Sequence, residues 1–432
     1  MAPSPDQEPF GNLAPFAEPA WYNDLASPYY NESHRRVRDY VRQYLSEHIV
    51  PYAEEWEENG HVPDEARKHY ARSGLAFQGI PREYSGAVGL PAGISHEDWD
   101  IFHSLVVNHE VSRIGYAGVT VGLSGGTSIG IPPIIVHGTE KQKRDWLPGI
   151  FTGEISFCLG ATEPTGGSDL ANLKTTAKKT EDGQAYIVNG HKKWITGAIR
   201  ATYMTTAVRT GGPGMAGVSM LVIPLDLPGV TRRRIKNSGW NAADSTWVTL
   251  ENVRVPADHL IGRENEGFPY LMINFNRERF TMAAGMNTQA RICLEDAWAY
   301  AMDRKTFGKP LFSHQVIRHK LATLARYIES HWAWIEQIAY HCKVNGGEMG
   351  PELASRIALA KVHGGRLLEL ASREAQQIFG GQGYQRGGLG GRVEQISRDV
   401  RVNIVGGGSE EIITDLAVRQ EMAIALKRGA KL

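Results

Sequence analysis

The feature that most constrains the fold is a hydrophobic period that changes twice along the 432 residues. In the segment ESHRRVRDYVRQYLSEHIVPYAEEWEENG, apolar residues recur at spacings of three and four, with charged residues between them. This period predicts an amphipathic helix, and Pro51 interrupts it. The apolar stripe consists of Val37, Tyr40, Val41, Tyr44 and Leu45.

A second helix is predicted after Gly138, in the charged segment GTEKQKRDWLPGIFTGE. Proline lacks a backbone donor and glycine ends helices readily, so we expect Pro148 and Gly149 to close this helix. From about residue 31 to residue 155 the chain therefore reads as an α-helical domain.

From about Ser156 to Gly262 the sequence pattern becomes typical of β-strands. The runs AYIVNGHKKWIT, TYMTTAVRT, VSMLVIPL and TWVTLENVRV are short and rich in β-branched and aromatic residues. Asn-Gly, Gly-Gly-Pro-Gly and Pro-Gly turn signals separate them. The pattern predicts a compact antiparallel barrel or sandwich.

Long helical patterns return after Gly267. The expected fold is α+β, with an N-terminal helical domain, a middle antiparallel β-barrel or sandwich, and a C-terminal four-helix bundle. The predicted divisions are a Pro-rich extension at 1–30, the first helical domain at 31–155, the β domain at 156–266 and the bundle at 267–432.

Composition excludes several classes of function. Lys plus Arg equals Asp plus Glu at 47 each, so no net charge recruits nucleic acid or an anionic membrane. Glycine, proline or charge breaks the longest apolar runs, which predicts no membrane span. Cys158, Cys293 and Cys342 are odd in number and far apart, which suits buried reduced thiols and neither disulfides nor a metal site.

Both ends of the chain bear on where in the cell the protein is expected. The first residues, MAPSPDQEPFGNLAPFAEPAW, are Pro-rich and acidic, unlike a transit or signal peptide, and are expected to be flexible or draped on the surface. The final Ala430-Lys431-Leu432 is similar to the SKL-type tripeptide of peroxisomal import. A peroxisomal location is therefore expected; an ordinary frayed C-terminus in a cytoplasmic protein is the alternative.

The strongest local signal is FCLGATEPTGGSDLA, residues 157–171, followed by YIVNGHKKWITG, residues 186–197. The first string is a Gly-rich strand end whose amides and hydroxyls can approach a planar ring closely. Taken alone, Trp194 could equally be a core aromatic and Thr162 a turn residue.

These strings resemble the flavin-binding signature of acyl-CoA dehydrogenases. Segments 138–154, 253–267, 304–315 and 377–412 resemble the same family in the same order. The resemblance implies that FAD is the cofactor and that no metal is required. The residues that match positions flanking the isoalloxazine are Thr162, Ser168, Trp194 and Thr196, where hydroxyls and amides would stabilise the reduced flavin.

The resemblance also places residues at the pyrophosphate and adenosine end of an FAD held by a neighbouring subunit, which implies a homodimer or homotetramer. An arginine suits a diphosphate because of its fork of donors; a surface arginine on a helix end is the alternative. The matching residues are Arg304, Phe307, Gln315, Gln377, Gly380, Gly381, Ser409 and Glu411.

The catalytic base departs from the commonest family pattern. Medium-chain and short-chain relatives carry it near the C-terminus in a Tyr-Glu-Gly-Thr string, but this chain reads VGGGSEEI and has Gly407 there. Isovaleryl-CoA and long-chain relatives carry the glutamate on the helix after the β domain, where RERFTMAAG provides Glu278. The resemblance makes Glu278 the base, and the Gly407 amide could still polarise the thioester. A salt-bridged helix start is the alternative for Glu278.

The activity implied is α,β-dehydrogenation of an acyl-CoA, with Ser168 and Arg279 near the CoA moiety. An electron-transfer flavoprotein or oxygen would take the electrons. Two alternatives stay open: an oxygen-using flavin oxidase or monooxygenase of the same fold acting on a specialised or non-CoA substrate, and a DNA-associated branch, which the balanced charge disfavours.

Overall fold

The computed structural model describes residues 9–430, and its chain divides into two compact units. The helical unit comprises Met1–Gln43, Trp99–Ala117 and Asn276–Leu432. The mixed unit comprises Tyr44–Asp98 and Gly118–Phe275. Each unit is thus assembled from segments far apart in the sequence.

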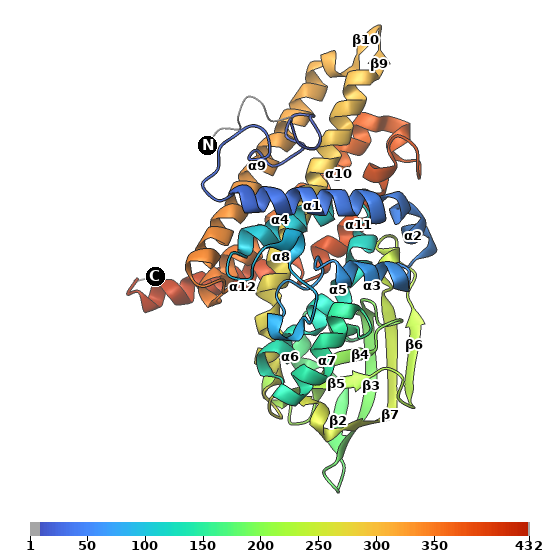
Figure 1. Cartoon of the computed structure of the whole chain (residues 1–432), viewed down its shortest axis with the longest axis vertical. Helices are drawn as coiled ribbons and strands as arrows, with labels where there is room; N and C mark the ends of the chain where they lie inside the picture. Colours follow the sequence, from blue (N-terminus) through green and yellow to red (C-terminus); the bar gives the residue numbers. More distant parts are fainter. Residues whose placement is uncertain (1–8, 431–432) are drawn as a thin grey trace. The chain divides into compact units, whose positions relative to one another are not determined.

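The mixed unit contains a sheet and the helices beside it (Figure 1). Its helices are α2 (Ala53–Asn59), α3 (Asp64–Arg72), α5 (Ala117–Gly130), α6 (Pro132–His137) and α7 (Glu140–Thr152). Its strands are β1 (Phe157–Gly160), β2 (Thr176–Lys179), β3 (Ala185–Ile195), β4 (Tyr203–Arg209), β5 (Val218–Pro224), β6 (Val230–Arg234), β7 (Thr246–Pro256) and β8 (Leu260–Ile261). The four β runs read from the sequence correspond to β3, β4, β5 and β7.

Strands β1 to β8 form one sheet in the order β6-β7-β3-β2-β4-β5-β8, with β1 added beside β4. Most neighbours are antiparallel, as predicted, but two strands pair with β4 in parallel. Strand β1 does so in a register that runs from Phe157↔Tyr203 to Gly160↔Thr206, and β2 does so at Thr176↔Arg209. The sequence patterns did not reveal these parallel pairs, because other strands lie between the partners in the chain.

Both faces of the sheet are covered by apolar side chains. Strand β5 is buried along almost its whole length, because alternate residues point to opposite faces. Val218, Met220 and Val222 share one cluster with α7, while Leu221 and Ile223 share the other with β3 and β7. The sheet is therefore a firm base for the loops at its strand ends.

Helix α7 differs from its prediction. It runs through Pro148 to Thr152 and ends at Gly153, which has a left-handed φ of 76°. Trp146, Leu147, Ile150 and Phe151 are buried on both sides of the proline. Burial of this continuous apolar face outweighs the one hydrogen bond that a proline removes.

The segment Ala117–His137 meets the length and composition of a membrane span, with 39% of its window buried. It consists of two helices, α5 and α6, separated at Ile131. Ile131 and Ile134 pack with Trp146 and Leu147 in the core of the mixed unit. These contacts explain its apolar composition by packing within the unit, and the absence of a membrane span remains a prediction.

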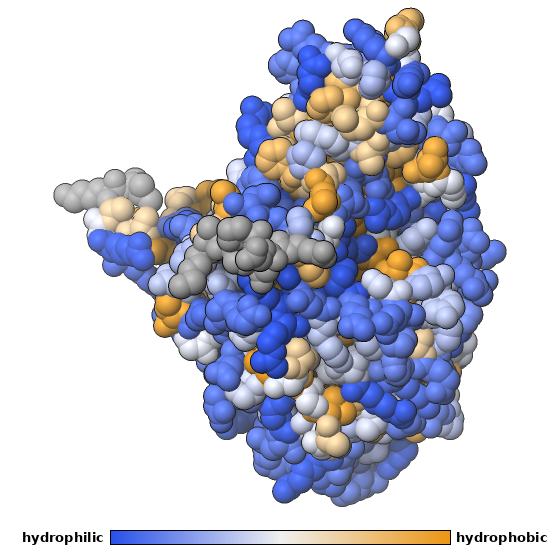
Figure 2. All heavy atoms as spheres, turned by 45° about the horizontal axis from the view of Figure 1, so that its top comes forward, coloured by the Kyte–Doolittle hydropathy of each residue, from blue (hydrophilic) through white to orange (hydrophobic). Residues whose placement is uncertain are grey.

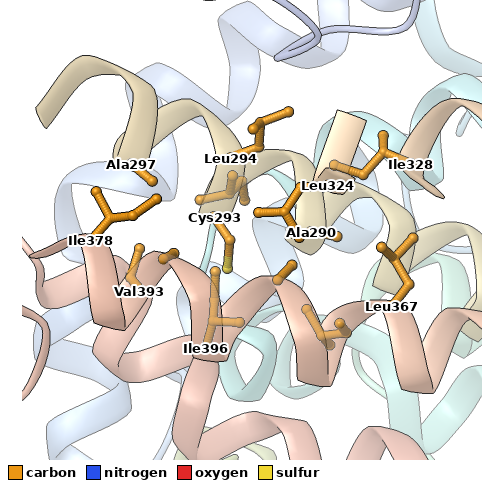
Figure 3. Packing of buried hydrophobic residues seen from close by; sticks show 14 of the residues in the cluster. Ala290, Cys293, Leu294, Ala297, Leu324, Ile328, Leu367, Ile378, Val393 and Ile396 are labelled. Atoms are coloured by element: carbon orange, nitrogen blue, oxygen red, sulfur yellow. The ribbon is translucent and has the colours of Figure 1, made fainter. Parts of the chain in front are cut away.

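The helical unit is built mainly from long helices. They are α4 (Ile101–Ser112), α9 (Gln315–Val344), α10 (Ala354–Phe379), α11 (Gly391–Val405) and α12 (Glu410–Lys427), with a small hairpin of β9 (Lys305–Thr306) and β10 (Lys309–Pro310). Most of α1 (Glu32–His48) and of α8 (Gly267–Asp303) also belongs to this unit, but residues 44–48 and 267–275 belong to the mixed unit. Helices α8, α9, α10 and α11 share one apolar core, in which Cys293, Leu324, Leu367 and Ile396 meet (Figure 3). The predicted C-terminal bundle is confirmed, and α12 adds to it through Ile413 against Ala358 of α10.

The two ends differ in how they are held. Trp21 and Tyr22 are buried, and the Tyr22 hydroxyl donates to Glu110 at 2.5 Å. Arg291 donates to the carbonyls of Phe16 and Glu18 at 2.9 and 3.1 Å. The part of the predicted extension from residue 9 onward is thus fixed on the helical unit rather than flexible. At the other end, residues 431 and 432 of the predicted import tripeptide lie outside the described residues.

Candidate active site

Glu278 lies in the interior of α8 and has an unusual environment. The residue as a whole is half-buried, but its Oε2 atom is buried and has no hydrogen-bond partner within residues 9–430. Burial raises the pKa of Glu278 to about 7, although the charges of Arg279 and Lys361 pull the pKa down. A carboxylate with a pKa near neutrality can both take up and release a proton at working pH.

The alternative that Glu278 starts a helix is wrong for the described structure. Helix α8 begins at Gly267, well before Glu278, so this residue is not at a helix start. Its Oε2 atom has no hydrogen-bond partner among the described residues, and the Arg279 Nε donates to the Gly407 carbonyl at 2.7 Å. A buried carboxylate without such a partner is costly, which is typical of functional sites.

Gly407 lies beside Glu278, in the turn between α11 and α12. Its φ of 65° and the φ of 104° at Gly408 are conformations that favour glycine. A Cβ added at Gly407 would lie 3.1 Å from the Met282 Sδ atom and 3.8 Å from the Glu278 Oε1 atom. A side chain at position 407 would therefore press against Met282, and the Glu278 carboxylate reaches this place from α8.

Arg279 was predicted to lie near the CoA moiety. Its Nε donates to the Gly407 carbonyl, and burial lowers the pKa of its guanidinium while Glu278 raises it. The contact shows that Arg279 fixes the turn beside Glu278. Its predicted role toward the substrate stays a prediction.

The sequence reading missed Lys361. This lysine of α10 is buried, with 1% of its surface exposed, and its Nζ donates to the carbonyls of Ile404 and Gly408, the latter at 3.0 Å. A signal was present, because Lys361 falls on the same helical face as Ile357, Ala358 and Leu368. A charged residue within an apolar stripe needs a partner, and here the partners are backbone carbonyls.

The residues predicted to flank the flavin ring lie at strand ends of the mixed unit. Trp194, near the end of β3, has a φ of 59° and is 51% exposed, and the Lys193 ammonium lies 4.1 Å from its ring centroid. The Lys193 amide donates to the Thr162 carbonyl at 3.0 Å, which brings the two predicted strings together. Trp194 is therefore not a core aromatic: its indole is open to a ligand.

Ser168 is exposed and Thr196 is half-buried, so both hydroxyls lie near the surface of the mixed unit. Behind them, the buried Lys192 ammonium donates to Glu163 at 2.8 Å and to the Ala161 carbonyl at 3.3 Å. Glu163 also accepts from the amides of Lys174 and Thr175. This ion pair, absent from the sequence reading, ties together the two segments that carry Thr162 and Trp194.

The residues predicted for the adenosine end of FAD lie on the surface of the helical unit. Phe307, in the β9–β10 hairpin, is 96% exposed with a φ of 51°. Gly380, where α10 ends, has a φ of 60°, and no atom lies within 4 Å of a Cβ added there or at Gly381. The exposed side chains in this set are Arg304, Gln315, Gln377 and Glu411, and half-buried Ser409 precedes the first residue of α12.

Two further clusters group side chains of the kinds that bind metals. His34, Asp100 and His103 form one, and Glu18, His109 and Glu110 form the other. Protein cations occupy both clusters: the Lys343 Nζ lies 2.7 Å from Asp100, and Arg42 lies 3.2 Å from Glu18. These are ion-pair networks that connect Glu18, α1 and α4 within the helical unit.

The sheet with its strand-end loops, the helical bundle and the buried carboxylate agree with the α+β fold and the site expected of a flavin-dependent oxidoreductase. The family models for the acyl-CoA dehydrogenase N-terminal, middle and C-terminal domains match residues 31–154, 158–253 and 265–422. The chain belongs to the acyl-CoA dehydrogenase family and is an oxidoreductase that acts on CH–CH groups.

Relatives agree over nearly the whole length. The chain is 45% identical over 419 residues to the acyl-CoA dehydrogenase AFT10-1 of Alternaria alternata, covering 95% of this chain and 96% of the relative. It is 40% identical to the acyl-CoA dehydrogenase apdG of Emericella nidulans, with 94% of each chain covered. A solved probable acyl-CoA dehydrogenase from Mycobacterium abscessus is 34% identical with a TM-score of 0.82, covering 91% of this chain and 100% of that one.

FAD is the cofactor of this family, and the residues present fit it. The exposed Trp194 indole next to the Thr196 hydroxyl suits a planar ring, since aromatic and donor groups meet at one strand end. The open space at Gly380 and Gly381 admits a ligand close to the backbone. Both predicted sets of residues thus have the exposure that cofactor binding requires.

Proposed function

We propose that this enzyme dehydrogenates an acyl-CoA thioester between Cα and Cβ, with Glu278 as the base that removes the α-proton. The observation that carries the proposal is the buried Oε2 atom of Glu278, which no hydrogen bond satisfies within the described chain. Such an atom has no hydrogen-bond partner of its own to give up, and a pKa of about 7 suits a base that takes a proton from a substrate carbon.

The turn beside Glu278 would polarise the substrate. Gly407 has an amide without a backbone partner in the part of the chain that the structure describes, and this amide can donate to the thioester carbonyl. A hydrogen bond to that oxygen stabilises the charge that develops when the α-proton leaves. Glu278 and Gly407 therefore act on neighbouring atoms of one substrate.

FAD, when bound, supplies the acceptor for the hydride that leaves Cβ. Thr162 and Thr196 would donate hydrogen bonds to its ring, and Trp194 would cover the ring and exclude water. Ser168 and Arg279 are proposed to contact the CoA moiety. A hydroxyl and a cation suit the anionic nucleotide end of that molecule.

The adenosine end of FAD is proposed to bind the exposed residues around Phe307, Gln377 and Gly380 of a neighbouring subunit. A homodimer or homotetramer is then needed for a complete site. Figure 2 shows apolar patches within a largely hydrophilic surface. Helix α12 exposes Val418, Met422 and Leu426, the kind of residues that subunit contacts bury.

The electron acceptor is proposed to be an electron-transfer flavoprotein, with oxygen as the alternative. Reoxidation of the reduced enzyme in air distinguishes them: rapid turnover with oxygen alone would support an oxidase. A peroxisomal location is proposed from Ala430-Lys431-Leu432. A fluorescent fusion with and without these three residues tests it.

The central test is anaerobic bleaching of the bound flavin by a panel of acyl-CoAs, in the wild type and in Glu278→Gln. Bleaching by the wild type and its loss in the variant are expected. Glu369→Gln is a matched control, because this exposed carboxylate pairs with Arg401 on the same unit. Wild-type bleaching rates in Glu278→Gln would overturn the assignment of the base.

A further inference from the structure

Lys361 is a buried cation that no assigned role explains. It lies on α10, and its ammonium donates to two backbone carbonyls, those of Ile404 and Gly408. A buried lysine normally pairs with a carboxylate, because an unpaired buried charge is costly. Within the described chain, Lys361 makes no ion pair of its own.

The two carbonyls lie on either side of Gly407. Ile404 is in the last turn of α11, where helix carbonyls lack partners, and a cation at that end is favourable. Gly408 is in the turn that leads to α12. The close approach of α10 needs a small residue, since a Cβ added at Gly365 would lie 3.2 Å from the Ile404 Cγ1 atom.

A second cation holds the same turn from α8. Arg279 donates to the Gly407 carbonyl at 2.7 Å, so the carbonyls of residues 404, 407 and 408 all accept from Lys361 or Arg279. Glycine has the greatest backbone freedom of any residue. Three successive glycines at 406–408 would otherwise sample many conformations, and the two cations select one of them.

The positive charge of Lys361 also acts on Glu278. Its ammonium and the Arg279 guanidinium both favour the ionised form of Glu278, and Glu410 of α12 is the other carboxylate that acts on Lys361. Glu410 is itself neutralised by Arg366. Burial lowers the pKa of Lys361 to about 8, so the ammonium remains mostly protonated at neutral pH.

We propose that Lys361 is a positioning residue of this active site: it holds the 404–408 turn so that the Gly407 amide meets the thioester carbonyl, and its charge favours ionised Glu278. The inference rests on the proposed function. It adds a residue that touches neither the substrate nor the flavin and acts through Gly407 and Glu278.

The test compares holoenzyme variants Lys361→Met and Lys361→Gln. Methionine keeps the volume and removes both donors and charge, whereas glutamine keeps amide donors without charge. Lys320→Met is the matched control. Lys320 of α9 also pairs with α10, the helix that carries Lys361, but its partner is the Glu374 side chain and not the 404–408 turn. The readouts are the pH profile of anaerobic flavin reduction, exchange of the substrate α-hydrogen in D₂O, and the thermal midpoint.

In Lys361→Met, we expect the rate of α-hydrogen exchange at pH 7 to fall about tenfold to a hundredfold. The Gly407 amide would then be misplaced and would stabilise the thioester oxygen less well. The acidic limb of the pH profile should move up by about 0.5–1 unit, since an opposite charge is lost. Lys361→Gln should keep the pH shift and recover part of the rate. The control should keep the wild-type profile.

A different pattern would overturn the proposal. If both Lys361 variants lower only the thermal midpoint and leave the pH profile and α-hydrogen exchange unchanged, the lysine is structural. If Lys361→Met does not fold, Lys361→Gln carries the same comparison of pH profiles. Failure of the proposed function itself is separate, because Glu278→Gln would then retain α-hydrogen exchange whatever happens at Lys361.

Discussion

Two buried lysines, one in each unit, show how differently a fold can use a charge. Lys192 in the mixed unit donates to Glu163 at 2.8 Å, and the pair fixes strand-end loops. Lys361 in the helical unit donates to backbone carbonyls, while nearby Glu278 has no partner for its Oε2 atom. Burial lowers the pKa of both lysines to about 8. The Lys192–Glu163 pair therefore stabilises the fold, whereas the unsatisfied Glu278 carboxylate stays free to accept a proton.

The largest effect is expected at the unpaired carboxylate. Glu278→Gln should lower the rate of flavin reduction by about 10³-fold, because a positioned base contributes 10²- to 10⁴-fold. Its thermal midpoint should stay the same or rise, because a costly buried charge is removed. Stopped-flow absorbance and calorimetry measure the two quantities. A large loss of stability with little loss of rate would reverse the comparison.

The paired lysine should behave in the opposite way. Lys192→Met leaves Glu163 buried without its cation, which should lower the free energy of unfolding by about 3–5 kcal/mol. Denaturant titration measures this loss. The double variant Lys192→Met with Glu163→Gln should recover part of the stability, since the isolated charge is gone. A neutral result for Lys192→Met would mean that the pair contributes little.

Gly407→Ala tests the glycine turn that Lys361 holds in the helical unit. The positive φ and the contact with Met282 should together lower the free energy of unfolding by about 2 kcal/mol. Gly346→Ala is the control, because Gly346 has a φ of 74° and no atom within 4 Å of an added Cβ. Equal losses in the two variants would show that contact with Met282 and Glu278 contributes nothing.

The smallest effect is a pH dependence. Because Glu278 has to be ionised to act, flavin reduction should fall below an apparent pKa of about 7, to roughly a tenth of its plateau at pH 6. Since the folded pKa is raised above the ordinary value of 4.5, the stability linked to this group is complete below about pH 4.5. It is lost as the pH rises through about 7. A rate that is flat from pH 5 to 8 contradicts this.

Much of the fold and part of the site followed from local sequence patterns. The runs that became β3, β4, β5 and β7 carry β-branched residues between turn signals, so they were predictable one strand at a time. Family motifs led to Glu278 and Gly407, which the structure places so that a Cβ added at Gly407 would lie 3.8 Å from the Glu278 Oε1 atom. Parallel pairing of β1 with β4 depends on which strands meet in space, and no local pattern encodes that.

The buried lysines were missed for a related reason. Lys192 and Lys193 are adjacent, and only the alternation of Tyr186, Val188 and Lys192 along β3 shows which of the two points inward. Lys361 lies on an apolar helix face, but its partners are carbonyls of residues more than 40 positions away. Every residue has a backbone carbonyl, so a partner of this kind cannot be recognised from the residue types in the sequence.

Glu278 lies inside the first third of a 37-residue helix, whereas the amide proposed to polarise the substrate comes from a glycine turn. The regular helix α8 fixes the backbone of the base, so its position depends less on the turn than the position of the Gly407 amide does. Proton abstraction and carbonyl activation can therefore change separately: a substitution at 406–408 could retune the enzyme toward a differently shaped acyl group without displacing the residue that begins the reaction.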